Sequence, residues 1–207
     1  MMDTSLEHVH EHEHEHAHGM EPHVKAARAR AGILMLILSD ALSVLAIFAA
    51  GGYLSALNTE GAFTATGDFA PALLPGILVA VGMALSGLLF YAWERTVHRG
   101  GKNGTTILFV LSWIILLAAG VGETWLGATL KYGTPISAYE SVLLFITWST
   151  AIHLLLTAVI GLLLFGRILN NRVRIDGLAF VPQVTGYWWY YTVIAGLLMW
   201  VFGVFFH

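Results

Sequence analysis

The chain contains no cysteine. Disulfide bonds, thiolate catalysis, iron–sulfur clusters and thiolate copper sites are therefore excluded. Charge is also scarce, because 11% of the 207 residues are charged and 57% are hydrophobic, whereas soluble domains carry roughly 25% charged residues. This composition predicts an integral membrane protein with little mass outside the bilayer. The formal net charge of -3 comes largely from the N-terminal tail and gives no reason to expect a nucleic-acid partner.

Motifs for chemistry are missing as well. The sequence has no Gly-rich phosphate loop, metalloprotease motif or Ser-elbow motif. A haem or copper centre inside a bilayer needs several histidines, and His153 is the only histidine within the apolar segments. The chain alone is therefore not expected to perform redox chemistry, which leaves an accessory subunit, a small transporter or a scaffold.

Five apolar segments are each at or above the roughly 20 residues that cross a bilayer. They predict an all-α, polytopic membrane fold, with a transmembrane domain over 25–207. The spans are expected at about 31–57, 71–94, 105–130, 138–166 and 180–206. The loops between them are too short for a soluble catalytic domain.

Basic residues gather at every second connection. The clusters are Lys25, Arg28 and Arg30, then Arg95, Arg99 and Lys102, then Arg167, Arg172 and Arg174. The first loop has no Lys or Arg, and the third has Lys131 alone. Positively charged loops stay in the cytoplasm, so the N-terminus is expected there and His207 outside.

The first 24 residues form a His- and Glu-rich tail that contains HVHEHEHEHAHGMEPH. Its apolar content is too low for folding alone, so disorder is expected. Imidazole and carboxylate groups can bind Zn²⁺, Cu²⁺ or Ni²⁺, but no spacing matches a closed metal site. Weak metal candidates and a solvated tail both remain open; the candidates are His10, His12, His14, His16 and His18.

The first span carries Asp40 well inside the apolar run LMLILSDALSVLAIFAAGGY. An ionisable side chain at that depth costs roughly 3 kcal/mol or more and usually has a function. Ser39, Asp40 and Ser43 fall on one helical face, and the small residues Ala46 and Ala50 extend it. Another helix or subunit can approach such a face closely. The alternative is an aspartate satisfied by local hydroxyl groups.

His153 and Glu123 are the other ionisable residues placed well inside the spans. At about 1.5 Å per residue, Asp40 lies about 15 Å from Arg30 and His153 about 21 Å from Arg167. Asp40 and His153 can therefore pair if their helices are adjacent, and low dielectric favours a charged or proton-sharing pair. A satisfied core histidine is the alternative. Glu123 lies nearer the outer end of its span.

Two segments resemble the subunit III family of haem-copper oxidases. The run LILSDALSVLAIFAAGGYL is similar to the family helix with a Ser-(Asp/Glu) pair, which Ser39 and Asp40 match. The segment TWSTAIHLLLTAVIGLLLFGRIL resembles the helix with His-Gly-x-His-Val. His153 matches its second histidine and Gly161 the glycine that follows, while Thr150 stands at the first histidine.

Two further spans resemble the same family. The run GYWWYYTVIAGLLMWVF is similar to a helix with Tyr-Trp-His-Phe-x-Asp-x-x-Trp, in which Tyr187 and Trp188 match. Trp189 and Thr192 replace the histidine and the aspartate. The stretch GVGETWLG is similar to the family's Gln/Glu-x-x-Glu stretch, with Glu123 at its first position. Five spans resemble the short bacterial form of the subunit.

The resemblance implies an accessory, redox-inert subunit of a proton-pumping terminal oxidase in a bacterial or archaeal cell membrane. Haem and copper would lie in partner subunits, and this chain would pack against the catalytic subunit I. It would hold phospholipid in a cleft and support proton uptake. Asp40 would be the acid of that cleft and His153 its partner, with Ser39, Ser43 and Glu123 beside them.

Two other functions stay open. One is a small metal or proton transporter whose His-rich tail senses metal and whose route is lined by Asp40, Glu123 and His153. Transporters usually show internal repeats or broken helices, and the sequence has no clear repeat. The other is an accessory subunit of a nitric oxide reductase complex. The electron donor, cytochrome c or quinol, is equally open.

Overall fold

Five long helices make up the regular structure of the part that the computed structural model describes, residues 22–58, 63, 73–99, 106–129, 137–170 and 180–205. They are α2 (Pro22–Ala56), α3 (Leu73–His98), α4 (Thr106–Thr129), α5 (Ala138–Leu169) and α7 (Phe180–Phe205). All five are long and apolar enough to cross a membrane. The predicted all-α fold with five spans is confirmed.

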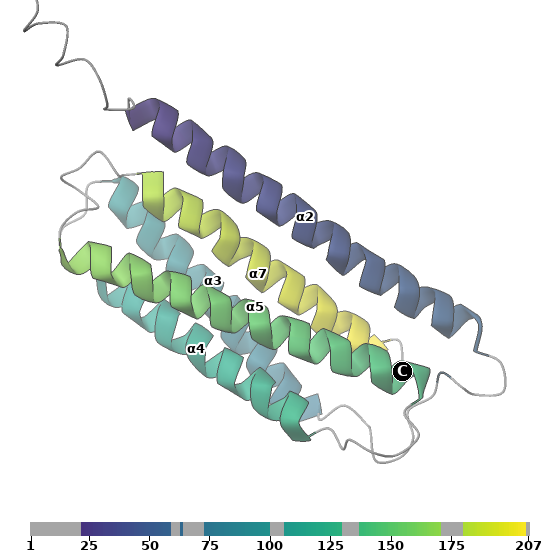
Figure 1. Ribbon diagram of the computed structural model, residues 1–207. Coiled ribbons are helices and arrows are strands. Elements are labelled where there is room, and N and C mark those ends of the chain that lie inside the picture. The colour runs from purple at the N-terminus through teal and green to yellow at the C-terminus, as the bar shows by residue number, and fades with distance from the viewer. Residues whose placement is uncertain are drawn as a thin grey trace, which may run out of the picture.

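Four of the helices form a bundle, and α2 lies outside it. In the bundle α3 packs against α4, α4 against α5, α5 against α7, and α7 against α3 (Figure 1). Within the described residues, helix α2 packs mainly against α7 and, to a smaller extent, against α5. As a result 6% of its apolar stretch is buried, compared with 28% or more in the other helices. The end of the molecule that carries Arg30, Arg95 and Arg167 is called the basic end below.

Helix α2 begins at Pro22, before the apolar stretch expected from residue 31. Proline suits a first helical position because the missing N–H has no partner there. The Ala, Lys and Arg residues that follow are good helix formers, so the helix extends beyond the apolar stretch. Of the tail expected over 1–24, residues 22–24 belong to α2 and the others lie outside the described residues.

Small residues set the close approach of α3 and α4. A Cβ atom added at Gly82 would lie 3.6 Å from the Cβ of Ala119. Ser86 Oγ donates to the carbonyl of Ser112 at 2.9 Å, and Ser112 Oγ donates to the carbonyl of Ser86 at 2.8 Å. This reciprocal pair joins the two backbones inside the bundle.

Candidate functional site

Asp40 and His153 meet where α2 crosses α5. Asp40 Oδ2 lies 2.8 Å from His153 Nε2. The two residues are far apart in the sequence, and α2 and α5 are in contact. The structure therefore brings together the two residues whose depths in the sequence allow a pair.

A tyrosine from a third helix completes the cluster. The hydroxyl of Tyr191 on α7 donates to the same oxygen, Asp40 Oδ2, at 2.5 Å. Three helices thus converge on one carboxylate oxygen. Tyr191 is not among the site residues predicted from the sequence, although a tyrosine inside an apolar span carries a hydroxyl that needs an acceptor.

The second ring nitrogen fixes the number of protons in the pair. His153 Nδ1 lies 2.7 Å from the carbonyl oxygen of Ser149. A carbonyl oxygen only accepts, so Nδ1 carries a proton. The contact between Nε2 and Asp40 Oδ2 then needs one further proton between two lone pairs. Whether this proton is on the ring or on the carboxyl group, the pair is neutral overall, and a proton can pass between the two residues.

Trp188 packs against one face of the His153 imidazole. Its ring lies nearly parallel to the His153 ring, with centroids 6.1 Å apart and an interplanar angle of 20°. Its Nε1 donates to Thr157 Oγ1 at 3.0 Å, and Thr157 Oγ1 lies 3.0 Å from Thr192 Oγ1. The orientation of His153 is therefore fixed by α5 and α7 together.

The cluster is open on one side. The Asp40 side chain is 25% exposed and that of His153 is 17% exposed. Ser43 Oγ donates to the carbonyl of Ser39, not to the carboxylate. Among the described residues, every hydrogen bond to Asp40 goes to Oδ2, and its other oxygen, Oδ1, has no partner. Local hydroxyl groups therefore do not satisfy this aspartate.

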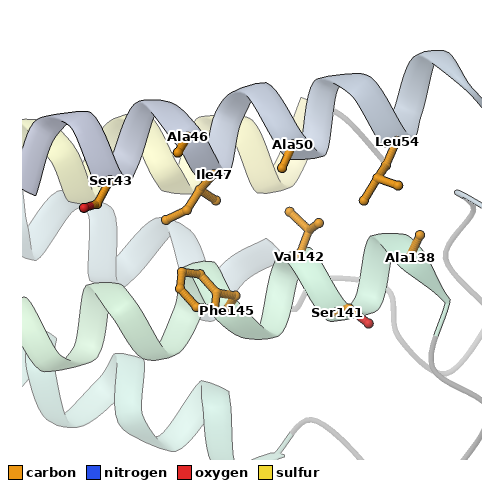
Figure 2. A pocket seen from close by; sticks show the side chains of 9 residues that line it. All are labelled: Ser43, Ala46, Ile47, Ala50, Leu54, Ala138, Ser141, Val142 and Phe145. Atoms are coloured by element: carbon orange, nitrogen blue, oxygen red, sulfur yellow. The ribbon is translucent and has the colours of Figure 1, made fainter.

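A groove of about 690 Å³ opens between α2 and α5 one helical turn from Asp40. It runs from the level of Ser43 and Phe145 toward the end opposite the basic end. In Figure 2, Val142 points from α5 toward α2, and Leu54 points from α2 toward α5. Residues from these two helices line the groove: Ser43, Ala46, Ile47, Ala50, Leu54, Ala138, Ser141, Val142 and Phe145. The small residues expected to allow a close approach thus border an open space.

Glu123 does not join this cluster. It lies on α4, which does not pack against α2. The residue is 8% exposed and faces the interior of the four-helix bundle. Gly120 packs against Leu154 and Gly127 against Thr147, so Glu123 is within about one turn of the level of His153. The structure therefore separates Glu123 from Asp40 laterally rather than in depth.

The structure shows two further acids that the sequence analysis did not include. Glu94 Oε2 accepts a 2.5 Å hydrogen bond from Tyr190, and Glu94 Oε1 lies 3.6 Å from His98 Nε2. Glu140 is fully buried and forms a capping box with Ser137 at the start of α5. The spacing of Ser137 and Glu140 before an apolar run is a signal for such a cap.

Four consecutive aromatic residues tie α7 to its neighbours. Their polar atoms all donate hydrogen bonds: Trp188 to Thr157, Trp189 to Ser86, Tyr190 to Glu94 and Tyr191 to Asp40. These acceptors lie on α5, α3, α3 and α2. Because successive residues point to different sides of a helix, one short run on α7 joins three helices.

Among the described residues, no three His, Cys, Asp or Glu side chains lie close enough to hold a metal ion. The tail candidates His10, His12, His14, His16 and His18 lie outside the described residues.

The fold and this cluster define a multi-pass membrane protein with five candidate spans and a paired carboxylate inside the first of them. No protein-family model matches the chain, and no curated protein matches it.

Proposed function

We propose that the chain is an accessory, redox-inert subunit III of an aerobic respiratory haem-copper terminal oxidase in a bacterial or archaeal cell membrane. One observation carries this proposal: Asp40, within the Ser39–Asp40 pair of the first span, is held by His153 and Tyr191 from two other spans. Ionisable residues placed at such depth are usually functional.

The exposed position of α2 supports a role as a subunit. The helix that carries Asp40 is also the least buried of the five. A catalytic site inside this chain would be expected in the packed bundle, whereas a group offered to another subunit belongs on its outside. The chain would stabilise the catalytic subunit through this side.

The groove between α2 and α5 supports lipid binding. Its lining is almost entirely apolar, and Ser43 and Ser141 are its only hydroxyl-bearing residues. An acyl chain of a phospholipid matches such a surface in shape and polarity. The lipid headgroup would sit near Leu54 and Ala138, at the end away from the basic end.

The Asp40–His153 pair supports a part in proton uptake. A pair that shares one proton is neutral, and it becomes neutral again once a proton accepted by one residue is followed by release of a proton from the other, so no charge remains in the low-dielectric interior after a complete transfer. In the proposed complex it would supply protons to an uptake route of the catalytic subunit. Haem and copper of the partner subunits would carry all the electron transfer.

The proposal is tested by purifying the tagged full-length chain from its native membrane. We expect a complex with haem absorption bands, bound copper and a large His-rich membrane subunit. A pure, intact complex without haem and copper would refute the proposal. A second preparation without residues 1–23 separates it from a metal transporter. If the chain is an oxidase subunit, oxygen consumption should stay nearly unchanged. If it is a metal transporter whose tail senses metal, metal transport should fall.

A further inference from the structure

One carboxylate oxygen of Asp40 is left unsatisfied by the described part of the chain. Asp40 Oδ1 has no hydrogen-bond partner among the described residues, and a quarter of the side chain is exposed. In hydrocarbon no water is present to satisfy it, and an unsatisfied polar group there is costly. The described helices supply no further donor to this oxygen, so a donor from a neighbouring molecule would relieve that cost.

Depth excludes a lipid headgroup as that donor. At about 1.5 Å per residue, Asp40 lies about 15 Å from Arg30 and about 24 Å from Ala56 along α2. The hydrocarbon layer is about 30 Å thick, so Asp40 is near its middle. Headgroups at either surface remain on the order of 15 Å away, and acyl chains carry no donor.

The surroundings of Asp40 fit a helix. Ser39 and Leu36 flank it on the exposed side of α2, and the hydroxyl of Ser43 already donates to the carbonyl of Ser39. A small side chain at position 39 lets a neighbouring backbone come close. The groove between α2 and α5 begins at Ser43, one turn further along α2, so a helix packed at Ser39 would leave the groove free for lipid.

We infer that a transmembrane helix of a neighbouring subunit packs against the Leu36–Ser39–Asp40 side of α2 and donates a hydrogen bond to Asp40 Oδ1. The donor is a side chain such as Ser, Thr, Asn, Tyr or Trp at the level of Asp40. This inference rests on the proposed function in so far as it takes the neighbour from the oxidase complex.

Two adjacent leucines provide a matched test. Leu36 is 51% exposed and lies one turn from Asp40 on the same side of α2, whereas Leu38 is 57% exposed and lies on the opposite side. The photoreactive residue p-benzoylphenylalanine is placed at either position of the full-length chain in its native membrane. After illumination, mass spectrometry identifies the adducts and the cross-linked residues.

We expect the probe at position 36 to join one apolar membrane segment that has a donor side chain within about one turn, and the probe at position 38 to label lipid. Adducts with lipid alone at both positions would overturn the inference, as would an adduct with a second copy of this chain or equal protein adducts at both positions.

Two variants compare the loss of the whole carboxylate with the loss of one internal bond to it. Asp40→Leu removes the acceptor and should lower the adduct at position 36 by roughly three- to tenfold, the range for one hydrogen bond between membrane helices. Tyr191→Phe removes an internal bond but leaves Oδ1 in place, so the adduct should persist. An adduct that survives Asp40→Leu unchanged would contradict the inferred hydrogen bond.

The outcomes also separate this inference from the proposed function. If the complex contains haem and copper but the probe at position 36 labels only lipid, the proposed function stands and the inferred contact at the Leu36–Ser39–Asp40 side of α2 is rejected. If the probe gives a specific protein adduct in a complex without haem and copper, the inferred helix contact stands and the proposed function as an oxidase subunit is rejected.

Discussion

Asp40 shows how one costly residue is accommodated. A lone carboxylate in the middle of a span costs roughly 3 kcal/mol or more. Here one of its oxygens accepts hydrogen bonds from Tyr191 and His153. Each bond to a charged group contributes about 1.5–3 kcal/mol in proteins generally, and less between membrane helices. The cluster therefore offsets the cost of the charge instead of adding a large net stabilisation.

The hydroxyl of Tyr191 should matter more than an ordinary tyrosine hydroxyl. Tyr191→Phe removes one donor to Asp40 without changing shape, and we expect a loss of about 1–2 kcal/mol in the free energy of unfolding. Tyr187→Phe is the control, because Tyr187 lies on the same helix and has no hydrogen-bond partner among the described side chains. The midpoint of thermal unfolding in detergent should fall for the first variant and stay for the second. Equal midpoints for both variants would contradict a stabilising role for this bond.

At the scale of the helix, α2 is attached at a few points along its length. Arg30 Nη2 donates to Gln183 Oε1 at 2.8 Å near the basic end, and Asp40 binds α5 and α7 near the middle. Beyond these, the rings of Phe48 and Phe202 stack with centroids 5.0 Å apart. Since so little of α2 is buried, these contacts largely determine how it sits on the bundle.

Two neighbouring glycines test this attachment. A Cβ atom added at Gly51 would lie 2.7 Å from Phe202 Cζ, whereas at Gly52 it would meet nothing within 4 Å. Gly51→Leu should push α2 from the bundle and destabilise the protein by about 1–3 kcal/mol, the usual cost of overpacking. Gly52→Leu should leave the unfolding midpoint unchanged. If Gly52→Leu destabilised the protein as much as Gly51→Leu, the described packing of α2 against Phe202 at Gly51 would be wrong.

The sequence contained enough to predict the helices but not their neighbours. Apolar runs of sufficient length predict five spans, and the depth of Asp40 and His153 allows a pair only if their helices touch. Which helices touch depends on side-chain packing between distant segments, such as Gly82 against Ala119. For that reason Tyr191 could not be assigned to Asp40, and Glu123 could not be placed apart from it.

For the whole molecule, the orientation in the membrane stays a prediction that the absence of cysteine makes easy to test. The basic loops predict that the basic end faces the cytoplasm. A single cysteine introduced as Asn58→Cys should react with a membrane-impermeant maleimide in intact cells. A cysteine introduced as Arg99→Cys should react only after the cells are opened. The reverse pattern would show that the chain is inserted the other way.

The central claim is that Asp40 serves a metal-bearing partner by exchanging protons, beyond joining α2 to the bundle. Asp40→Asn is the direct test, because the amide keeps the size of the side chain and can still accept from Tyr191 but cannot exchange a proton as a carboxyl group does. Leu38→Ala, at an exposed position on the opposite side of α2, is the control.

The deciding measurement compares the amount of purified complex with its proton uptake and active lifetime during turnover. With Asp40→Asn, we expect a normal yield of complex, slower proton uptake and a shorter lifetime, while Leu38→Ala behaves like the unchanged chain. A reduced yield of Asp40→Asn complex whose remaining molecules take up protons and turn over normally would contradict the claim and leave Asp40 a packing residue.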